Sequence, residues 1–203
     1  KDCEDTGMSI SVLARFERPV TVEDLLLYEN ESHFSLFPWE TKTSLSGNVH
    51  ALEGLRASGL PPDHPSVQKI VRFLDRTRQP QGYWLDKLHT SPLYTASHAV
   101  IASAGYCEDV VRPTVRWIQR SQRPNGAWGH HAPTAEETAY ALQALTMWAR
   151  AGGDVALDSL DRGKAWLSEH AAPPYEPLWI GKCLYCPTLV VRSAVVSALL
   201  MEA

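Results

Sequence analysis

The sequence has no block of basic residues: its 19 Lys and Arg alternate with 23 Asp and Glu, for a net charge of −4. This pattern excludes the charge footprint of a nucleic-acid-binding protein and a polybasic membrane anchor. Its longest apolar run, residues 189–201, contains Arg192 and is too short to span a bilayer. Only four cysteines occur, which suits a reducing compartment better than a disulfide scaffold, so we expect a cytoplasmic protein without an integral membrane segment.

Candidate metal ligands are also few. Cys183 and Cys186 have the spacing of half a zinc site, but no second pair follows, so we interpret them as packing residues. His130 and His131 precede Pro133 in a polar loop, where a solvated turn is the simpler interpretation. The sequence therefore predicts no metal site within this chain.

What the sequence does contain is a repeat of helix pairs. Gln119-x-x-Gln-x-x-x-Gly126-x-Trp128 leads into an Ala-rich helix, and similar turns hold Gln79, Gly82 and Trp84, then Trp179. A weaker copy runs from Val22 through Trp39 to Asn48. Such a period, roughly 40 to 50 residues, is typical of stacked helical hairpins.

Hydrophobic periodicity predicts an all-α chain with weak strand signals throughout. A short, largely buried helix ends near Arg15, and a second begins at Thr21, which starts a capping-box variant. A third begins near Ser46 or Asn48 and stops at Gly59. Six more are expected, over Ser66 to Arg78, Thr95 to Ala104, Pro113 to Gln122, Ala135 to Ala151, Asp158 to His170 and Thr188 to Glu202.

The two members of each pair differ in composition. The first helices carry charges such as Lys69, Arg72 and Arg116, so one face meets water, whereas the second helices are rich in small apolar residues. We expect an α/α barrel, or toroid, with a charged outer layer and an Ala-rich inner layer around a central cavity.

These turns resemble the QW repeats of squalene–hopene cyclases and class II terpene cyclases. The opening Asp2-Cys-Glu4-Asp5-Thr resembles their acidic D-x-D-D-T motif, and the segments around Asn48 and residues 179–187 are similar to bacterial copalyl-diphosphate-synthase-like diterpene cyclases. The similarity covers nearly the whole chain. It implies that residues 1–203 are the C-terminal part of a β-type α/α-barrel domain, as a fragment or one piece of a split protein. The missing N-terminal part would then be its partner.

The resemblance implies a reaction started by protonating an alkene, a very weak base. Glu4 stands at the position of the proton donor, where the family has Asp, and its carboxyl lies one methylene further out. Asp2 and Asp5 would polarise it, because crowded carboxyls raise the pKa of at least one member. If the helix began at Asp2, however, Asp2 and Asp5 would share a face and Glu4 would point elsewhere. The alternative is an ordinary helix N-terminus capped by Asp2 or Asp5.

Two residues compete as the partner that orients the acid. Asn48 falls near the polar residue that performs this role in the family, and His50 is close enough to be its rival. The alternative interpretations are an N-cap for Asn48 and an ordinary helix histidine for His50.

Aromatic residues are candidates for the cavity wall, since π faces stabilise a cationic intermediate. We expect Trp179 and Tyr185 to contact substrate, and Trp84 and Trp128 to hold outer helices together. Lys182 could meet a diphosphate as a point charge, although a solvated surface lysine is the simpler interpretation.

Together these features predict a class II diterpene cyclase, an isomerase that converts geranylgeranyl diphosphate into a bicyclic, copalyl-type diphosphate. The resemblance implies a Mg²⁺ cofactor whose site lies outside this chain. One alternative is a squalene–hopene-type triterpene cyclase. Another is a non-catalytic α/α-toroid that binds a lipid or a partner, which the Glu at the donor position would suit.

Overall fold

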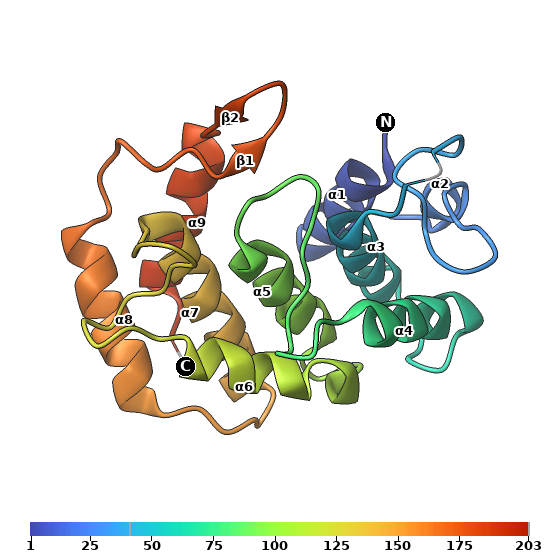
Figure 1. The fold of residues 1–203 in the computed structure, drawn as a ribbon. Coiled ribbons are helices and arrows are strands. Elements are labelled where there is room, and N and C mark those ends of the chain that lie inside the picture. The colour runs from blue at the N-terminus through green and yellow to red at the C-terminus, as the bar shows by residue number, and fades with distance from the viewer. Residues whose placement is uncertain (41, 203) are drawn as a thin grey trace.

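The computed structural model describes residues 1–40 and 42–202. Helices dominate the described part of the chain, together with one 3₁₀ turn (Glu108–Val110) and one short hairpin. The helices are α1 (Cys3–Arg15), α2 (Glu23–Leu26), α3 (Leu45–Ala57), α4 (Pro65–Thr77), α5 (Pro92–Ser103), α6 (Arg112–Arg120), α7 (Ala135–Arg150), α8 (Leu157–Glu169) and α9 (Thr188–Leu200). The hairpin pairs β1 (Trp179–Ile180) with β2 (Leu184–Tyr185), antiparallel (Figure 1).

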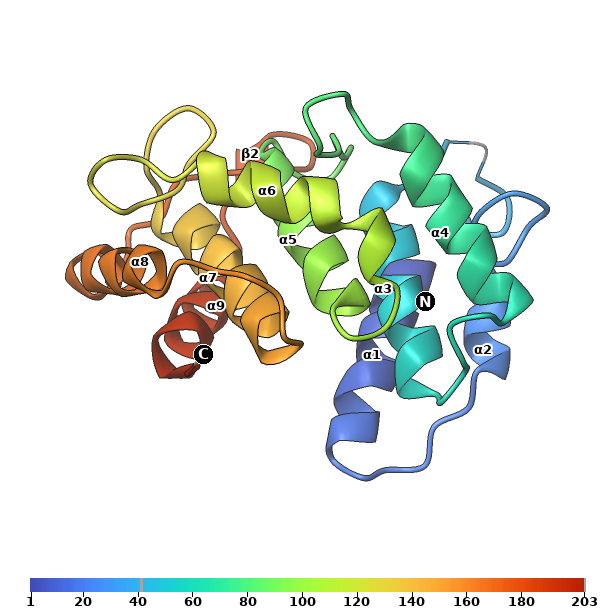
Figure 2. The same ribbon diagram turned by 90° about the horizontal axis from the view of Figure 1, so that it is seen from below.

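The helices form two layers around an arc. Helices α1, α3, α5, α7 and α9 follow one another along the inner layer, each packed on the next, and α4, α6 and α8 lie on the outside (Figure 2). The predicted all-α, α/α-toroid architecture with an Ala-rich inner layer is therefore confirmed. None of the described helices is both long enough and apolar enough to cross a bilayer.

The connecting turns repeat in atomic detail, which explains the sequence repeat. The indole nitrogen of Trp84 donates to the carbonyl of Leu74 (2.9 Å), and that of Trp128 donates to the carbonyl of Ile118 (2.8 Å), each ten residues earlier on an outer helix. Gly82 and Gly126 adopt positive φ angles of 106° and 91°, which favour glycine.

The second turn also joins two outer helices. The Gln122 side chain donates to the carbonyls of Gly126 and Ser159 and accepts a bond from the Ser159 hydroxyl, which ties α6 to the start of α8. The predicted structural role of Trp84 and Trp128 thus matches their fully buried positions.

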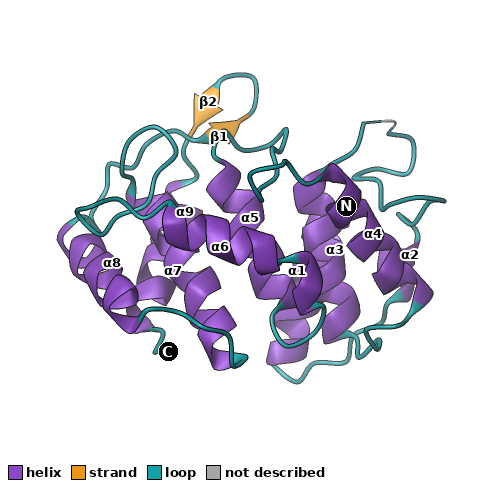
Figure 3. Cartoon of the chain, turned by 60° about the horizontal axis from the view of Figure 1, so that its bottom comes forward, coloured by secondary structure: helices purple, strands orange, loops and turns teal. Residues whose placement is uncertain are grey.

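Three elements differ from the sequence-based expectations. Helix α5 begins three residues earlier than Thr95, because Ser91 caps it and Pro92 occupies its first turn. Helix α2 has a single turn, and no side chain caps it at Val22. The hairpin was not predicted: its two-residue strands are too short to give an alternating pattern (Figure 3).

Helix α1 is less buried than its composition predicts. Gly7 packs on α3 and Ile10 is buried, whereas Met8, Val12 and Leu13 remain 41–51% exposed. Two of these three residues, Met8 and Val12, border the hollow inside the arc. The side of α1 that faces away from α3 thus forms part of the concave surface on which the candidate site lies.

Candidate active site

A close helix crossing brings Glu4, from the acidic motif, to the interior. Gly7 of α1 faces the backbone of α3, where a Cβ would lie within 2.6 Å of the carbonyl carbon of His50. A Cβ on Gly54 would come within 3.0 Å of the Cα of Gly7. This approach, possible only without side chains, places Glu4 against the first turns of α3.

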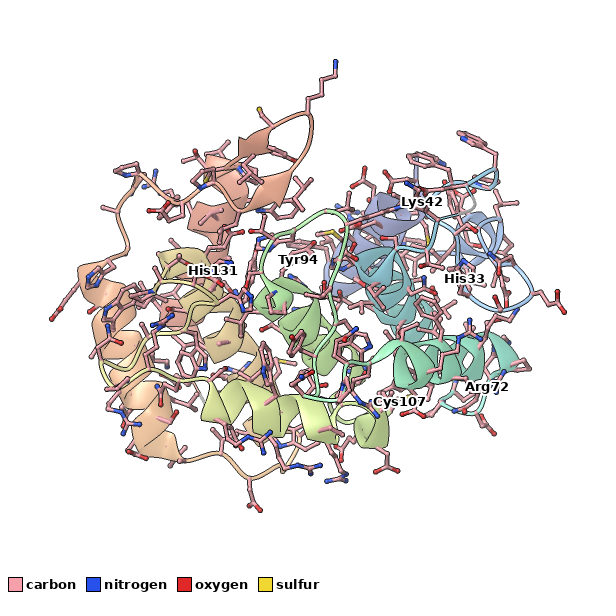
Figure 4. All side chains as sticks on the ribbon, in the orientation of Figure 1. His33, Lys42, Arg72, Tyr94, Cys107 and His131 are labelled. Carbon is pink, nitrogen blue, oxygen red and sulfur yellow. The ribbon has the colours of Figure 1, made fainter. Side chains whose placement is uncertain are left out.

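Glu4 is enclosed by polar groups from two other inner helices. The residue is 9% exposed, and its carboxyl accepts a bond from the Ser46 hydroxyl at Oε2 (3.0 Å) and from the Tyr94 hydroxyl at Oε1 (3.0 Å). The Nε2 atom of His50 lies 3.7 Å from Oε1 and 3.3 Å from the Tyr94 hydroxyl. Tyr94 reaches this position from the first turn of α5, in the middle of the arc (Figure 4).

The surroundings favour the protonated form of this acid. Burial raises the pKa of Glu4 above its ordinary value of 4.5, and the charge of Asp86 acts in the same direction. The charge of His50 and the bonds from Ser46 and Tyr94 oppose this rise, but they do not cancel it. Glu4 is thus a buried acid that holds its proton to a higher pH than a carboxyl in water.

Asp2 and Asp5 do not join this cluster. Asp2 caps α1 by accepting a bond from the backbone N–H of Asp5 (2.8 Å), and the Asp5 side chain is exposed on the rim of the cavity. The helix begins at Cys3, so the carboxyl of Glu4 points inward while the other two remain outside. The carboxyl that does influence Glu4 is Asp86, which accepts a bond from the backbone N–H of Ser46 (2.7 Å).

His50 links Glu4 to a third carboxyl. Its Nδ1 lies 3.5 Å from Oε2 of Glu53, one turn along α3. Burial lowers the pKa of His50, but the bond with Glu53 and the charges of both carboxyls outweigh it and raise the pKa in sum. Burial raises the pKa of Glu53, but the bond and the charge of His50 outweigh this effect, so that the pKa is lowered in sum. Both shifts favour an imidazolium–carboxylate pair of His50 and Glu53, which lies beside Glu4 with its raised pKa.

A second buried histidine, His98, has a lowered pKa, whereas that of His50 is raised. His98 packs edge-on to His50 and Tyr94, with ring centroids 4.8 Å apart in each case. Burial, together with the charge of His50, lowers its pKa to about 3. His98 is thus a neutral ring in the cavity wall.

Asn48 is not brought to the acid. Its amide exchanges bonds of 2.8 Å with the backbone of Phe34 and donates to the carbonyl of Ser44 (2.8 Å). Nor is it an N-cap, since Ser44 caps α3. Asn48 instead fixes the loop before α3, and of the two rival residues the structure places His50 beside Glu4.

Glu4 opens onto a cavity of ≈ 500 Å³ inside the arc. Its lining includes Trp179 and Tyr185, and it ends on α9. A further hollow of ≈ 260 Å³ follows along the same concave face and is bordered by all five inner helices. Lys182 lies outside both linings, exposed in the turn of the hairpin.

The remaining candidates lie away from the site. Trp39 is 80% exposed, and Cys183 and Cys186 are free thiols near the hairpin. Within residues 1–40 and 42–202, no group of three His, Cys, Asp or Glu side chains is arranged to hold a metal ion. The larger cavity therefore presents one buried acid and a wall of aromatic and aliphatic side chains, and the His50–Glu53 pair borders the smaller hollow.

Comparison with known proteins agrees with this architecture. The model of the squalene–hopene cyclase C-terminal domain matches residues 41–179, more than half of the chain. The chain belongs to this terpene cyclase family. A type B diterpene cyclase from Mycobacterium tuberculosis is 39% identical over 202 residues, and an ent-copalyl diphosphate synthase from Streptomyces sp. strain KO-3988 is 33% identical over 208.

A solved structure extends the match to three dimensions. The ent-copalyl diphosphate synthase from Streptomyces platensis superposes with a TM-score of 0.90 at 32% identity, over 98% of this chain. This chain spans about two fifths of these relatives: 40% of each of the two sequences and 41% of the solved chain. The cyclase fold and family thus apply to nearly all of its residues.

The structure also brings to the acid residues that the sequence did not place beside it, including Tyr94, which the sequence offered only as one of the aromatic candidates for the cavity wall. Ser46, Tyr94 and Asp86 surround Glu4, and Glu53 pairs with His50. Helical spacing could have indicated Ser46 and Glu53, which lie four residues before and three after His50 on one helix. Tyr94 and Asp86 carry no such local signal, because they lie 90 and 82 positions from Glu4 in the printed numbering.

Proposed function

We propose that this chain provides the part of a class II diterpene cyclase that bears the catalytic acid. Its substrate is a polyprenyl diphosphate such as geranylgeranyl diphosphate, and its product is a bicyclic, copalyl-type diphosphate. The observation that carries this proposal is the buried Glu4 with a raised pKa, which faces an apolar cavity. The printed names of the relatives, a diterpene cyclase and copalyl diphosphate synthases, support the same class of reaction.

In this mechanism the Glu4 O–H bond breaks and a C–H bond forms at the distal alkene. The carbocation that results is attacked in turn by neighbouring alkenes until two rings have closed. A base in the active site then accepts a proton from the cation, which restores a double bond, and the Glu4 carboxylate regains a proton from solvent before the next turnover. The diphosphate is retained, so the product is an isomer of the substrate. The cavity contributes by excluding water from the cation, and its aromatic rings stabilise the positive charge.

The hydroxyl groups around Glu4 suit both stages of the transfer. A hydroxyl can accept a bond from the carboxylic acid and, after rotation, donate one to the carboxylate. Ser46 and Tyr94 therefore support the acid before transfer and stabilise the anion afterwards. From the family resemblance alone, we further propose that Mg²⁺ assists diphosphate binding through groups other than those described above.

The test uses the natural protein at its full length, incubated with geranylgeranyl diphosphate and Mg²⁺ and analysed by mass spectrometry. Glu4→Gln, which keeps the shape but removes the acidic proton, should abolish cyclisation. Glu23→Gln, an exposed change on α2, serves as the matched control. Wild-type turnover by the Glu4→Gln protein would exclude Glu4 as the donor.

The same assay separates the two alternative functions. A squalene–hopene-type enzyme would cyclise squalene instead, and a non-catalytic toroid would return both substrates unchanged. Either result would refute the diterpene cyclase proposal.

A further inference from the structure

A second buried carboxyl lies behind the cavity wall and takes no part in protonation. Glu136 sits in the first turn of α7 and is 1% exposed. Three side chains converge on its Oε1 atom: the indole nitrogen of Trp179 (2.7 Å), the hydroxyl of Tyr140 (3.2 Å) and Nε2 of His89 (3.4 Å). Its Oε2 atom is buried without a hydrogen-bond partner among the described residues.

All three neighbours are donors to this oxygen. An indole N–H can only donate. The Nδ1 atom of His89 accepts a bond from the backbone N–H of Ser91 (3.0 Å), so the imidazole proton lies on Nε2, which faces Glu136. In the described part of the chain, no Lys or Arg forms an ion pair with Glu136. Three donors without an acceptor suit a carboxylate ion whose charge is not neutralised by a cation.

Two of the three donors are rings of the cavity wall. Trp179 and Tyr140 line the cavity, and both pack on Tyr94, with centroid separations of 5.0 and 5.5 Å. Tyr94 is the residue whose hydroxyl donates to Glu4. Glu136 thus holds the rings that surround the acid. It lies behind the cavity wall and is hydrogen-bonded to the rings that face the substrate.

The carboxylate also changes the electrostatics of these rings. An anion that accepts an N–H or O–H bond polarises the attached ring and makes its π face more negative. The face of an aromatic ring attracts a cation through this negative charge. A carbocation formed beside Trp179 would therefore be stabilised by the ring and by the charge behind it.

We propose that Glu136 is a positioning residue of the cyclisation cavity, which fixes the indole of Trp179 and the phenol of Tyr140 and places negative charge behind them. This inference rests on the proposed cyclase function. It assigns the residue no direct contact with substrate, since Glu136 does not line the cavity.

The test compares two neighbouring substitutions in the full-length protein. Glu136→Gln keeps an oxygen acceptor but removes the charge, and should lower kcat about tenfold with KM changed less than about twofold. Products released early, with one ring or with a captured water, should increase. The control is Glu137→Gln: Glu137 is equally buried but binds the Thr134 hydroxyl and the backbone N–H of His130, on a different side of α7. It should lower the melting temperature without changing kcat or the products.

A spectroscopic measurement tests the anchoring without turnover. In protein labelled with 5-fluorotryptophan, the ¹⁹F resonance lost in Trp179→Phe identifies Trp179. Glu136→Gln should shift this resonance, and Glu137→Gln should leave it in place. An unshifted resonance would overturn the anchoring role.

Combined variants test whether the two residues act together. In a Trp179→Phe background the indole N–H is already absent, so Glu136→Gln should cost less than in the wild type. Additive losses, or wild-type kcat and products in Glu136→Gln, would overturn the inference while the cyclase proposal stands. A wild-type protein without cyclisation would refute the proposed function instead.

Discussion

The close crossing of α1 and α3 predicts that Gly7→Ala destabilises the protein, contrary to the usual effect of alanine in a helix. In an ordinary helix, Gly→Ala stabilises the fold by about 1 kcal/mol, because alanine is the better helix former. In Gly7→Ala, the added Cβ would lie within 2.6 Å of the His50 carbonyl carbon and closer still to its oxygen. Carbon atoms in contact need about 3.5–4.0 Å, so α1 must move away from α3 by roughly 1 Å.

The overpacking should reverse the usual effect of alanine. Forcing a methyl group into a close-packed contact costs about 1–3 kcal/mol, which exceeds or offsets the gain in helix propensity. We therefore expect Gly7→Ala to lower the free energy of unfolding by up to about 2 kcal/mol, the overpacking cost less the gain in helix propensity, measured by urea denaturation with an unchanged m-value.

The same displacement should affect the proposed chemistry more strongly. Glu4 lies one turn before Gly7, and moving it changes its distances to Ser46 and Tyr94, now 3.0 Å each. A misplacement of this size can reduce a rate about a hundredfold. Ser9→Ala, on the exposed side of α1, is the control and should change neither quantity. A Gly7→Ala protein more stable than the wild type would refute the reasoning.

Two further predictions concern the acid and the repeat. The bonds from Tyr94 and Ser46 lower the pKa of Glu4, so Tyr94→Phe or Ser46→Ala should raise it. Because the donor works only while protonated, the alkaline limb of the kcat/KM–pH profile should then move to higher pH. A move to lower pH would contradict the assignment. Trp128→Phe should reduce the free energy of unfolding by about 1–3 kcal/mol, because the bond to Ile118 is lost and the ring is smaller. In the same denaturation assay Trp39→Phe, at an 80% exposed position, should have little effect.

The sequence predicts the scaffold well because its signals are local. Each turn joins residues within about ten positions of one another, so Gly82 and Trp84, or Gly126 and Trp128, reveal the repeat without knowledge of the fold. The inner layer follows from small residues around the whole helix surface, which can be accommodated only between two neighbours.

The candidate site is harder to predict because its contacts come from distant segments. Glu4 is hydrogen-bonded to Ser46 and Tyr94, which lie 42 and 90 positions away in the sequence. Glu136 is hydrogen-bonded to Trp179, 43 positions away. The family resemblance grouped Asp2 and Asp5 with Glu4 in one acidic motif, although helical spacing placed Glu4 on another face if the helix began at Asp2. A helix that begins at Cys3 separates them, since residues one or two positions apart do not share a face.

The position of Glu4 in α1 sets two effects against each other. The N-terminus of a helix favours a carboxylate by roughly 0.3–1 kcal/mol when exposed, so a carboxyl in the first turn would ordinarily be ionised. Asp2 and Asp5, at the same helix end, have access to solvent. Glu4 is instead buried beside two hydroxyls and the His50 ring, and the cost of burial is the largest influence on its pKa. A donor at this site therefore requires the inward direction of the side chain, which the α1–α3 crossing imposes, more than it requires the neighbouring acids.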